Sequence, residues 1–208
     1  MTDKIEPKKG TTTVGIITSE GVVLAADKRA SMGYLIAHKN AQKIHRLIND
    51  IALTIAGGVG DAQMLIRYVQ AEAKLYEMKN NRETTIKALS TLLAHILYGG
   101  KGYFPYYVQF LLGGKDSTGY SLVSLGPDGS KLEDEFISTG SGSVFAYGVL
   151  QEHYKKDMKL ETAIGVAVKA VNVAIERDIY TGDGINVVVI DKNGYRELSK
   201  EEINSYLK

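Results

Sequence analysis

The chain has 208 residues, of which 44% are hydrophobic, 25 are Lys or Arg and 24 are Asp or Glu. This length and composition are typical of one globular domain that buries a sizeable core, and the balanced charge excludes a strong overall field that would attract nucleic acid or an anionic membrane. Because the chain has no cysteine, disulfides, thiolate metal sites and a cysteine nucleophile are excluded as well.

The first ten residues form a polar leader. They include five charged side chains and no apolar run, so the leader is neither a secretory signal nor a membrane span, and no later segment is long enough to cross a bilayer. We therefore expect a soluble cytoplasmic protein.

The first half of the chain passes from strands to helices. Residues 12–27 hold two apolar, β-branched stretches around a Ser-Glu-Gly turn, which is the pattern of a hairpin. A short run at 34–37 and a polar segment precede a strand at 51–58, which ends in paired glycines where the backbone can turn or come close to another group. Two helices should follow, because apolar residues recur at the spacing of one helix face. These residues are Ala62, Leu65, Ile66 and Val69 in the first helix and Ile86, Leu89, Leu93 and Ile96 in the second.

The second half repeats this order. Strands are predicted at 106–112, 120–125 and 136–138, bounded by Gly113-Gly114 and by a Pro-Asp-Gly turn at 127–129. A third helix should begin near Ser143, and a fourth at 161–177 has a broad apolar face with small residues that permit close packing. A hairpin follows, with its first strand at 185–191, and then a short helix near 200–206. This order suits an α+β domain in which sheets lie between helix layers.

The usual sequence signals of catalysis are missing. The chain has no G-x-S-x-G elbow, P-loop, H-E-x-x-H helix or dinucleotide-binding glycine motif. Its four histidines are scattered, and each is interpreted as a surface or packing residue rather than as a base or a metal ligand. We expect neither a metal nor a cofactor.

The junction between the leader and the first strand offers a nucleophile, because it reads Gly10-Thr11-Thr12-Thr13. A threonine at a new N-terminus can use its own α-amine as general base, since an amine with a pKa of about 8 accepts a proton near neutral pH. Such chemistry would require cleavage of the Gly10-Thr11 bond. Threonines also favour strands, so the run by itself is explained by the start of a strand and decides nothing.

Five further blocks follow this junction in a fixed order. They are AADKRAS at 25–31, NAQKI at 40–44, TIAGGVGDAQ at 54–63, STGSGS at 138–143 and RDIYTGDGI at 177–185. Together with GTTTVGI, the series resembles the proteasome beta subunits, particularly the archaeal type, over nearly the whole chain after the leader. The resemblance implies the fold of the N-terminal nucleophile hydrolases, a four-layer αββα sandwich of two antiparallel sheets between helix layers. This fold agrees with the element order derived above.

The resemblance implies a catalytic centre built on three residues. Thr11 is similar to the family's nucleophile, Asp27 to its acid, and Lys43 to the lysine beside the threonine. A lysine near the amine would lower the pKa of that amine, while Asp27 would keep Lys43 charged and oriented; which nitrogen takes the hydroxyl proton stays open. Without the resemblance, Asp27 would be an ordinary hairpin end and Lys43 a surface residue.

Four more residues are implied to support this centre. The Gly57 N–H matches the oxyanion donor, a role that needs close backbone approach and so suits glycine, although a turn glycine is the simpler interpretation of this residue alone. Ser141, Asp178 and Thr181 match the residues that hold the threonine and the lysine in place. The family usually has serine at the position of Thr181.

The same resemblance implies how substrate binds. A peptide would extend as a strand along the backbone at Ser31, Gly57 and Val59. The implied specificity pocket is lined by Ala30, Ala41, His45, Ile55 and Val59. Since most of these side chains are small or apolar, we expect cleavage after apolar residues, with His45 as the exception to this character of the pocket.

The implied protein is a self-activating threonine endopeptidase. Thr11 would attack peptide carbonyls and would also remove residues 1–10 as a propeptide, leaving 11–208 as a single catalytic domain; the uncleaved chain is then a latent precursor. The resemblance further implies seven-membered rings with other beta subunits, alpha subunits outside them, an unfoldase ATPase and unfolded proteins as substrates. Three alternatives stay open: a non-catalytic ring subunit, a bacterial two-ring peptidase of the same fold, and an N-terminal nucleophile amidohydrolase that acts on small amides.

Overall fold

The computed structural model describes residues 10–100, 102 and 105–207. The predicted propeptide therefore lies outside the described residues except for Gly10. The strands are β1 Thr13–Ile17, β2 Gly21–Asp27, β3 Ala30–Met32, β4 Leu35–His38, β5 Ile44–Ile48, β6 Ile51–Gly57, β7 Val108–Asp116, β8 Gly119–Leu125, β9 Lys131–Glu133, β10 Phe136–Thr139, β11 Ile185–Asp191 and β12 Gly194–Glu197. The helices are α1 Val59–Asn80, α2 Ile86–Gly100, α3 Ser143–His153, α4 Leu160–Arg177 and α5 Lys200–Ser205.

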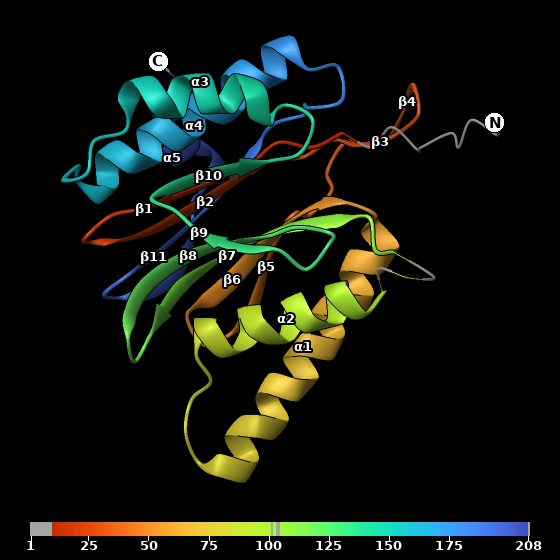
Figure 1. Cartoon of the computed structure of the whole chain (residues 1–208). Helices are drawn as coiled ribbons and strands as arrows, with labels where there is room; N and C mark the ends of the chain where they lie inside the picture. Colours follow the sequence, from red (N-terminus) through yellow and green to blue (C-terminus); the bar gives the residue numbers. More distant parts are fainter. Residues whose placement is uncertain (1–9, 101, 103–104, 208) are drawn as a thin grey trace.

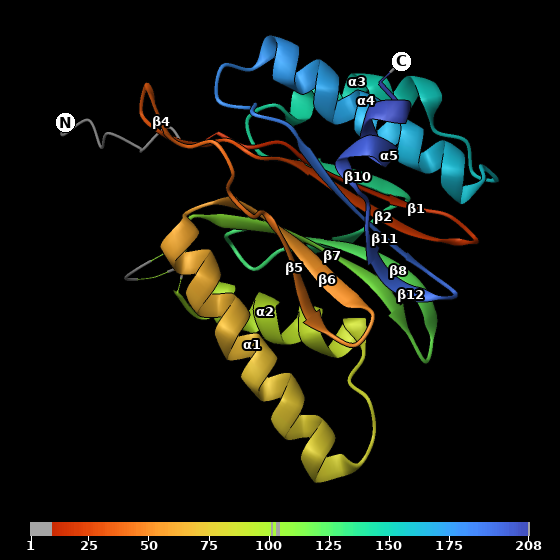
Figure 2. The same ribbon diagram turned by 180° about the vertical axis from the view of Figure 1, so that it is seen from behind.

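Two five-stranded antiparallel sheets lie face to face between helix layers (Figure 1 and Figure 2). One sheet has the strand order β10-β1-β2-β11-β12 and is covered by α3, α4 and α5. The other has the order β5-β6-β7-β8-β9 and is covered by α1 and α2. The predicted four-layer arrangement is confirmed.

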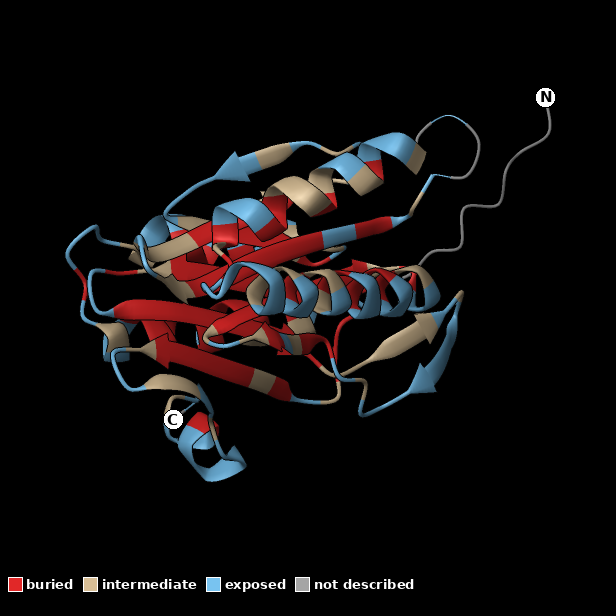
Figure 3. Cartoon of the chain, turned by 90° about the horizontal axis from the view of Figure 1, so that it is seen from below, coloured by how far each residue is buried: buried red, intermediate tan, exposed pale blue. Residues whose placement is uncertain are grey.

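Apolar side chains fill the spaces between these layers, and β2 shows how the sequence encodes this. All seven residues of β2 are buried, with Val22, Leu24 and Ala26 between the two sheets and Val23 and Ala25 against the helices. Alternate residues of a strand point to opposite faces, so a strand buried on both faces reads as a continuous apolar run. Figure 3 shows the buried strands inside and the exposed outer faces of the helices.

The sequence predicted that a strand ends at the glycine pair Gly113-Gly114. This prediction is wrong, because β7 continues through the pair to Asp116. A β-carbon at Gly113 would lie 2.9 Å from Cγ1 of Val22 in the facing sheet, and one at Gly114 would lie 2.1 Å from the carbonyl oxygen of Asp50. These glycines therefore allow close approach within the sandwich, and the chain turns later, between β7 and β8.

Strand β5 lies in what the sequence presented as a polar segment. Its register with β6 shifts between Arg46 and Ile48, and Arg46 is exposed, so no clean alternation of apolar and polar residues marks the strand. Pairing with β6 forms it, and the carbonyl of Lys43 accepts the N–H of Ile55 at 2.9 Å just before it begins. β5 thereby fixes the backbone position of Lys43.

The predicted helices are all present. α4 buries the small and apolar face that the sequence predicted, while Ile96 of α2 is only partly buried and Leu97 is fully buried in its place. Among the described residues, no helix is both long enough and apolar enough to span a membrane.

Candidate active site

Thr11 lies just before β1, where β1 is enclosed on both sides. Thr13 pairs with Ala26 of β2 and with Thr139 of β10, so the residues before β1 are held beside the end of one strand and the loop after the other. Thr11 is only 6% exposed. Its Oγ1 donates to the carbonyl oxygen of Gly10 at 2.6 Å and accepts a hydrogen bond from Lys43 Nζ at 3.0 Å.

Asp27 and Lys43 form a buried ion pair, with Lys43 Nζ 2.6 Å from Asp27 Oδ1. The carboxylate also accepts the backbone N–H groups of Thr12, Arg29 and Gly182, so four donors compensate for its removal from water. Burial lowers the pKa of Lys43 from its usual value, and the attraction of Asp27 opposes this change. Lys43 is therefore no surface residue, and its amine gives up a proton more readily than an exposed lysine does.

A second set of hydrogen bonds reaches Thr11 from the opposite side. Ser141 Oγ accepts the N–H of Thr11 at 3.3 Å and donates to Asp178 Oδ2. Thr181 donates to the same carboxylate oxygen at 2.6 Å. Because a hydroxyl carries one proton, Thr12 must be the donor in the 2.8 Å contact between the hydroxyls of Thr12 and Thr181. The three predicted residues Ser141, Asp178 and Thr181 therefore lie together beside Thr11, and Thr12 joins them.

Gly57 ends β6 in a conformation that suits glycine. Its φ angle is +106°, and a β-carbon there would lie 2.1 Å from the carbonyl oxygen of Tyr107. Gly57 lines the same cleft as Thr11. The end of β6 thus contributes glycine backbone, without a side chain, to the wall of the cleft that also contains Thr11.

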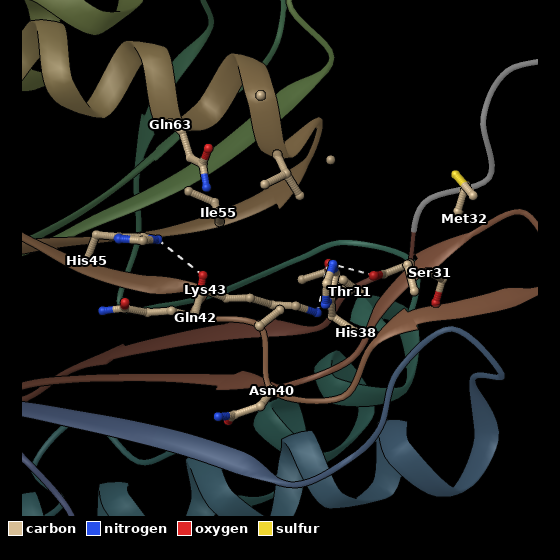
Figure 4. Close-up of a pocket in the computed structure, with 17 residues that line it drawn as sticks. Thr11, Ser31, Met32, His38, Asn40, Gln42, Lys43, His45, Ile55 and Gln63 are labelled. Atoms are coloured by element: carbon tan, nitrogen blue, oxygen red, sulfur yellow. Dashed lines mark hydrogen bonds between the residues drawn. The ribbon is translucent and has the colours of Figure 1, made fainter.

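A cleft of about 570 Å³ opens beside Thr11 (Figure 4). Its walls include Thr11, Lys43 and Gly57, and the Lys43 side chain extends toward Thr11. All seven residues predicted to contact substrate line it, namely Ala30, Ser31, Ala41, His45, Ile55, Gly57 and Val59. Segments from β3, β5, β6 and the start of α1 therefore meet at one opening.

His45 is partly exposed and lines the cleft. Its Nε2 lies 3.1 Å from the carbonyl oxygen of Gln42, so this nitrogen carries a proton. Burial lowers the pKa of His45, and the Gln42 carbonyl opposes the change. The imidazole is consequently uncharged at neutral pH.

In the part of the chain that the structure describes, no three His, Cys, Asp or Glu side chains are grouped as a metal site would require.

Sequence reasoning missed the residues that fix the loop between α4 and β11. Arg29 Nε lies 2.7 Å from Asp183 Oδ2, and Arg29 Nη1 donates to the carbonyl of Ile179 at 2.9 Å. Ser31 Oγ donates to the carbonyl of Tyr180 at 3.4 Å. The loop that carries Asp178 and Thr181 is thus tied to the segment after β2. The signal was present, since Arg29 and Asp183 each lie in one of the blocks that carried the resemblance.

The chain is similar to known proteins over nearly all of its length. A family model described as proteasome subunit matches residues 7–190. The proteasome subunit beta of Methanospirillum hungatei is 49% identical over 205 residues, covering 98% of both chains. That of Methanothermobacter thermautotrophicus is 48% identical, covering 98% of this chain and 96% of its own, and the proteasome subunit beta 1 of Thermococcus sibiricus is 49% identical, covering 99% and 97%. These matches confirm the resemblance predicted from the sequence blocks, and the chain belongs to the proteasome subunit family.

Proposed function

We propose that this chain is a threonine-type endopeptidase and acts as a catalytic beta subunit of a proteasome core particle. The observation that carries the proposal is Lys43 Nζ, which is buried 3.0 Å from Thr11 Oγ1 and 2.6 Å from Asp27 Oδ1. Burying a charged pair costs free energy, and such pairs with a lowered lysine pKa cluster at catalytic sites. A non-catalytic ring subunit would not need this arrangement. The name proteasome subunit beta, which the relatives share, supports the same assignment.

Thr11 would first remove the leader by attacking the carbonyl carbon of Gly10. In the uncleaved chain the nitrogen of Thr11 is an amide and cannot act as a base, so Lys43, in contact with Oγ1, takes the hydroxyl proton. The bond from Oγ1 to the Gly10 carbonyl carbon forms, the carbon–nitrogen bond breaks, and the proton passes to the departing nitrogen. Water then hydrolyses the ester, which releases residues 1–10 and leaves a free amine on Thr11.

The mature centre would use the same hydroxyl against peptide substrates. Thr11 Oγ1 attacks the peptide carbonyl, and the Gly57 N–H stabilises the oxyanion. Water activated by the freed amine then releases the acyl-enzyme. Ser141, which accepts the Thr11 N–H at 3.3 Å, holds this nitrogen, and Asp178 and Thr181 keep Ser141 in place. Either the amine or Lys43 can serve as the base of this second reaction.

The cleft would bind the substrate residue that precedes the scissile bond. Ala30, Ala41 and Ile55 give it an apolar wall, and His45 is uncharged, so an apolar side chain is favoured. The peptide would extend along the backbone at Ser31, Gly57 and Val59. Peptides that differ only at this residue test the assignment, and fastest cleavage after an acidic residue would contradict it.

The assembly in which this reaction takes place is also a proposal. It comprises seven-membered rings with other beta subunits, flanking rings of alpha subunits, and an unfoldase ATPase that delivers unfolded proteins in the cytoplasm. The support is the shared name of the relatives and the resemblance in sequence.

The test is intact mass after assembly with the alpha subunit, followed by peptide hydrolysis with and without an inhibitor that reacts with N-terminal threonine. We expect loss of residues 1–10 and cleavage that the inhibitor abolishes. Thr11→Ala is the matched control, since it should assemble but stay uncut and inactive. Normal processing of this variant would refute Thr11 as the nucleophile, and an uncut, inactive parent chain within an assembled ring would favour the non-catalytic subunit.

A further inference from the structure

Gly10, the residue before the proposed cleavage site, is enclosed on one side by Tyr180. A β-carbon at residue 10 would lie 1.6 Å from Cβ of Tyr180, 2.6 Å from its Cγ and 2.8 Å from its Cα. Carbon atoms that are not bonded to each other pack at about 3.5–4.0 Å. A side chain at residue 10 and Tyr180 therefore cannot both occupy their places.

Tyr180 cannot relieve this overlap by changing its rotamer, because rotation of the side chain moves Cγ but leaves Cβ at 1.6 Å and Cα at 2.8 Å in place. Its backbone is also held on both sides. The N–H of Tyr180 donates to Asp178 Oδ1 at 3.2 Å, and its carbonyl accepts from Ser31 Oγ at 3.4 Å. Two residues later the N–H of Gly182 donates to Asp27 Oδ2 at 2.9 Å. Retreat of Tyr180 would disturb hydrogen bonds that reach Asp27 and Asp178.

Gly10 cannot easily rotate away either. Its carbonyl oxygen accepts the hydroxyl of Thr11 at 2.6 Å, and this contact keeps the carbonyl beside the nucleophile. A side chain at residue 10 would thus overlap with Tyr180. In a peptide substrate, the side chain of the residue before the scissile bond would instead lie in the cleft lined by Ala30, Ala41 and Ile55.

We infer that Tyr180 is a specificity-determining residue for removal of the leader, because it admits only glycine immediately before Thr11. The inference rests on the proposed self-cleavage. Leader removal and peptide hydrolysis then use one nucleophile, but different surfaces select the residue before the bond that is cut. The loop between α4 and β11 selects it in the leader, and the cleft selects it in substrates.

The test is a double-mutant cycle on the rate of leader removal. The rate is measured by intact mass against time after assembly with the alpha subunit. Gly10→Ala should slow removal by about tenfold or more when Tyr180 is present, because the added carbon must displace its neighbour. The same slowing should persist with Tyr180→Ala, which keeps the atom at 1.6 Å. It should be much smaller with Tyr180→Gly, which removes the atoms at 1.6 and 2.6 Å and leaves only Cα, at 2.8 Å. Each rate is compared with that of Gly10 in the same Tyr180 variant. An equal effect of Gly10→Ala in all three, or no effect with Tyr180 present, would overturn the inference.

A second readout requires no cleavage. In a Thr11→Ala precursor, Gly10→Ala should lower the midpoint of thermal unfolding when residue 180 is Tyr or Ala and should have a smaller effect when it is Gly; equal effects would again overturn the inference. Peptide hydrolysis by a chain that begins at Thr11, released from a fusion partner by a site-specific protease, tests the proposed function without leader removal. Failure of the one proposal is thereby distinguished from failure of the other.

Discussion

Replacing Lys43 by arginine separates the charge of this side chain from its ability to take a proton. Lys43 Nζ contacts Asp27 Oδ1 at 2.6 Å and Thr11 Oγ1 at 3.0 Å. Arginine keeps a positive charge for Asp27 but does not lose its proton in proteins. A positioned base contributes about 10²- to 10⁴-fold to a rate, so we expect Lys43→Arg to slow cleavage of the Gly10-Thr11 bond by a factor of that order.

The assay is intact mass against time after assembly, with the free energy of unfolding measured in parallel. Lys43 is only 4% exposed, so the larger arginine should cost about 1–3 kcal/mol of stability by overpacking. Lys43→Met is the matched variant, since it removes both charge and base. It leaves the carboxylate of Asp27 buried with three backbone donors but no counter-charge, and should cost about 3–5 kcal/mol. Cleavage at the parent rate by a folded Lys43→Arg protein would refute Lys43 as the base.

Three further predictions follow from the same contacts. Leader removal should slow by about tenfold for each pH unit below the pKa of Lys43, because only the neutral amine takes a proton; since burial lowers that pKa, the rate measured by mass should reach its plateau at a lower pH than an exposed lysine would give. Gly113→Ala should lower the free energy of unfolding by about 1–3 kcal/mol, measured by thermal unfolding, because its β-carbon would lie 2.9 Å from Val22 in the facing sheet. The control Gly148→Ala, in α3 with no atom within 4 Å of the new carbon, should raise the free energy of unfolding by about 0.5–1 kcal/mol. Equal effects of the two substitutions would contradict the argument. Thr181→Val should lower the free energy of unfolding by about 1–3 kcal/mol, measured by thermal unfolding, because the buried hydroxyl of Thr12 loses its acceptor. Thr181→Ser should have a free energy of unfolding close to that of the parent. A valine variant as stable as the parent would show that this hydrogen bond is dispensable.

The sequence determined the elements whose signal is local. The continuous apolar run of β2 and the small and apolar face of α4 each predict one element and its burial, because a strand or helix repeats its contacts at a fixed period along the chain. The ordered blocks predicted the family and, through it, the four-layer sandwich and the residues around Thr11. For these features the one-dimensional pattern carries the information.

Only the tertiary structure decided the features that depend on what lies opposite a residue. Gly113-Gly114 has the sequence of a turn but lies within β7, because the facing sheet and the carbonyl of Asp50 come too close for a β-carbon. The lowered pKa of Lys43 depends on its burial beside Asp27, and the enclosure of Gly10 depends on Tyr180, which is far along the chain. Local propensity contains no term for such contacts, since they join separate segments of the chain and form only when these segments are packed together.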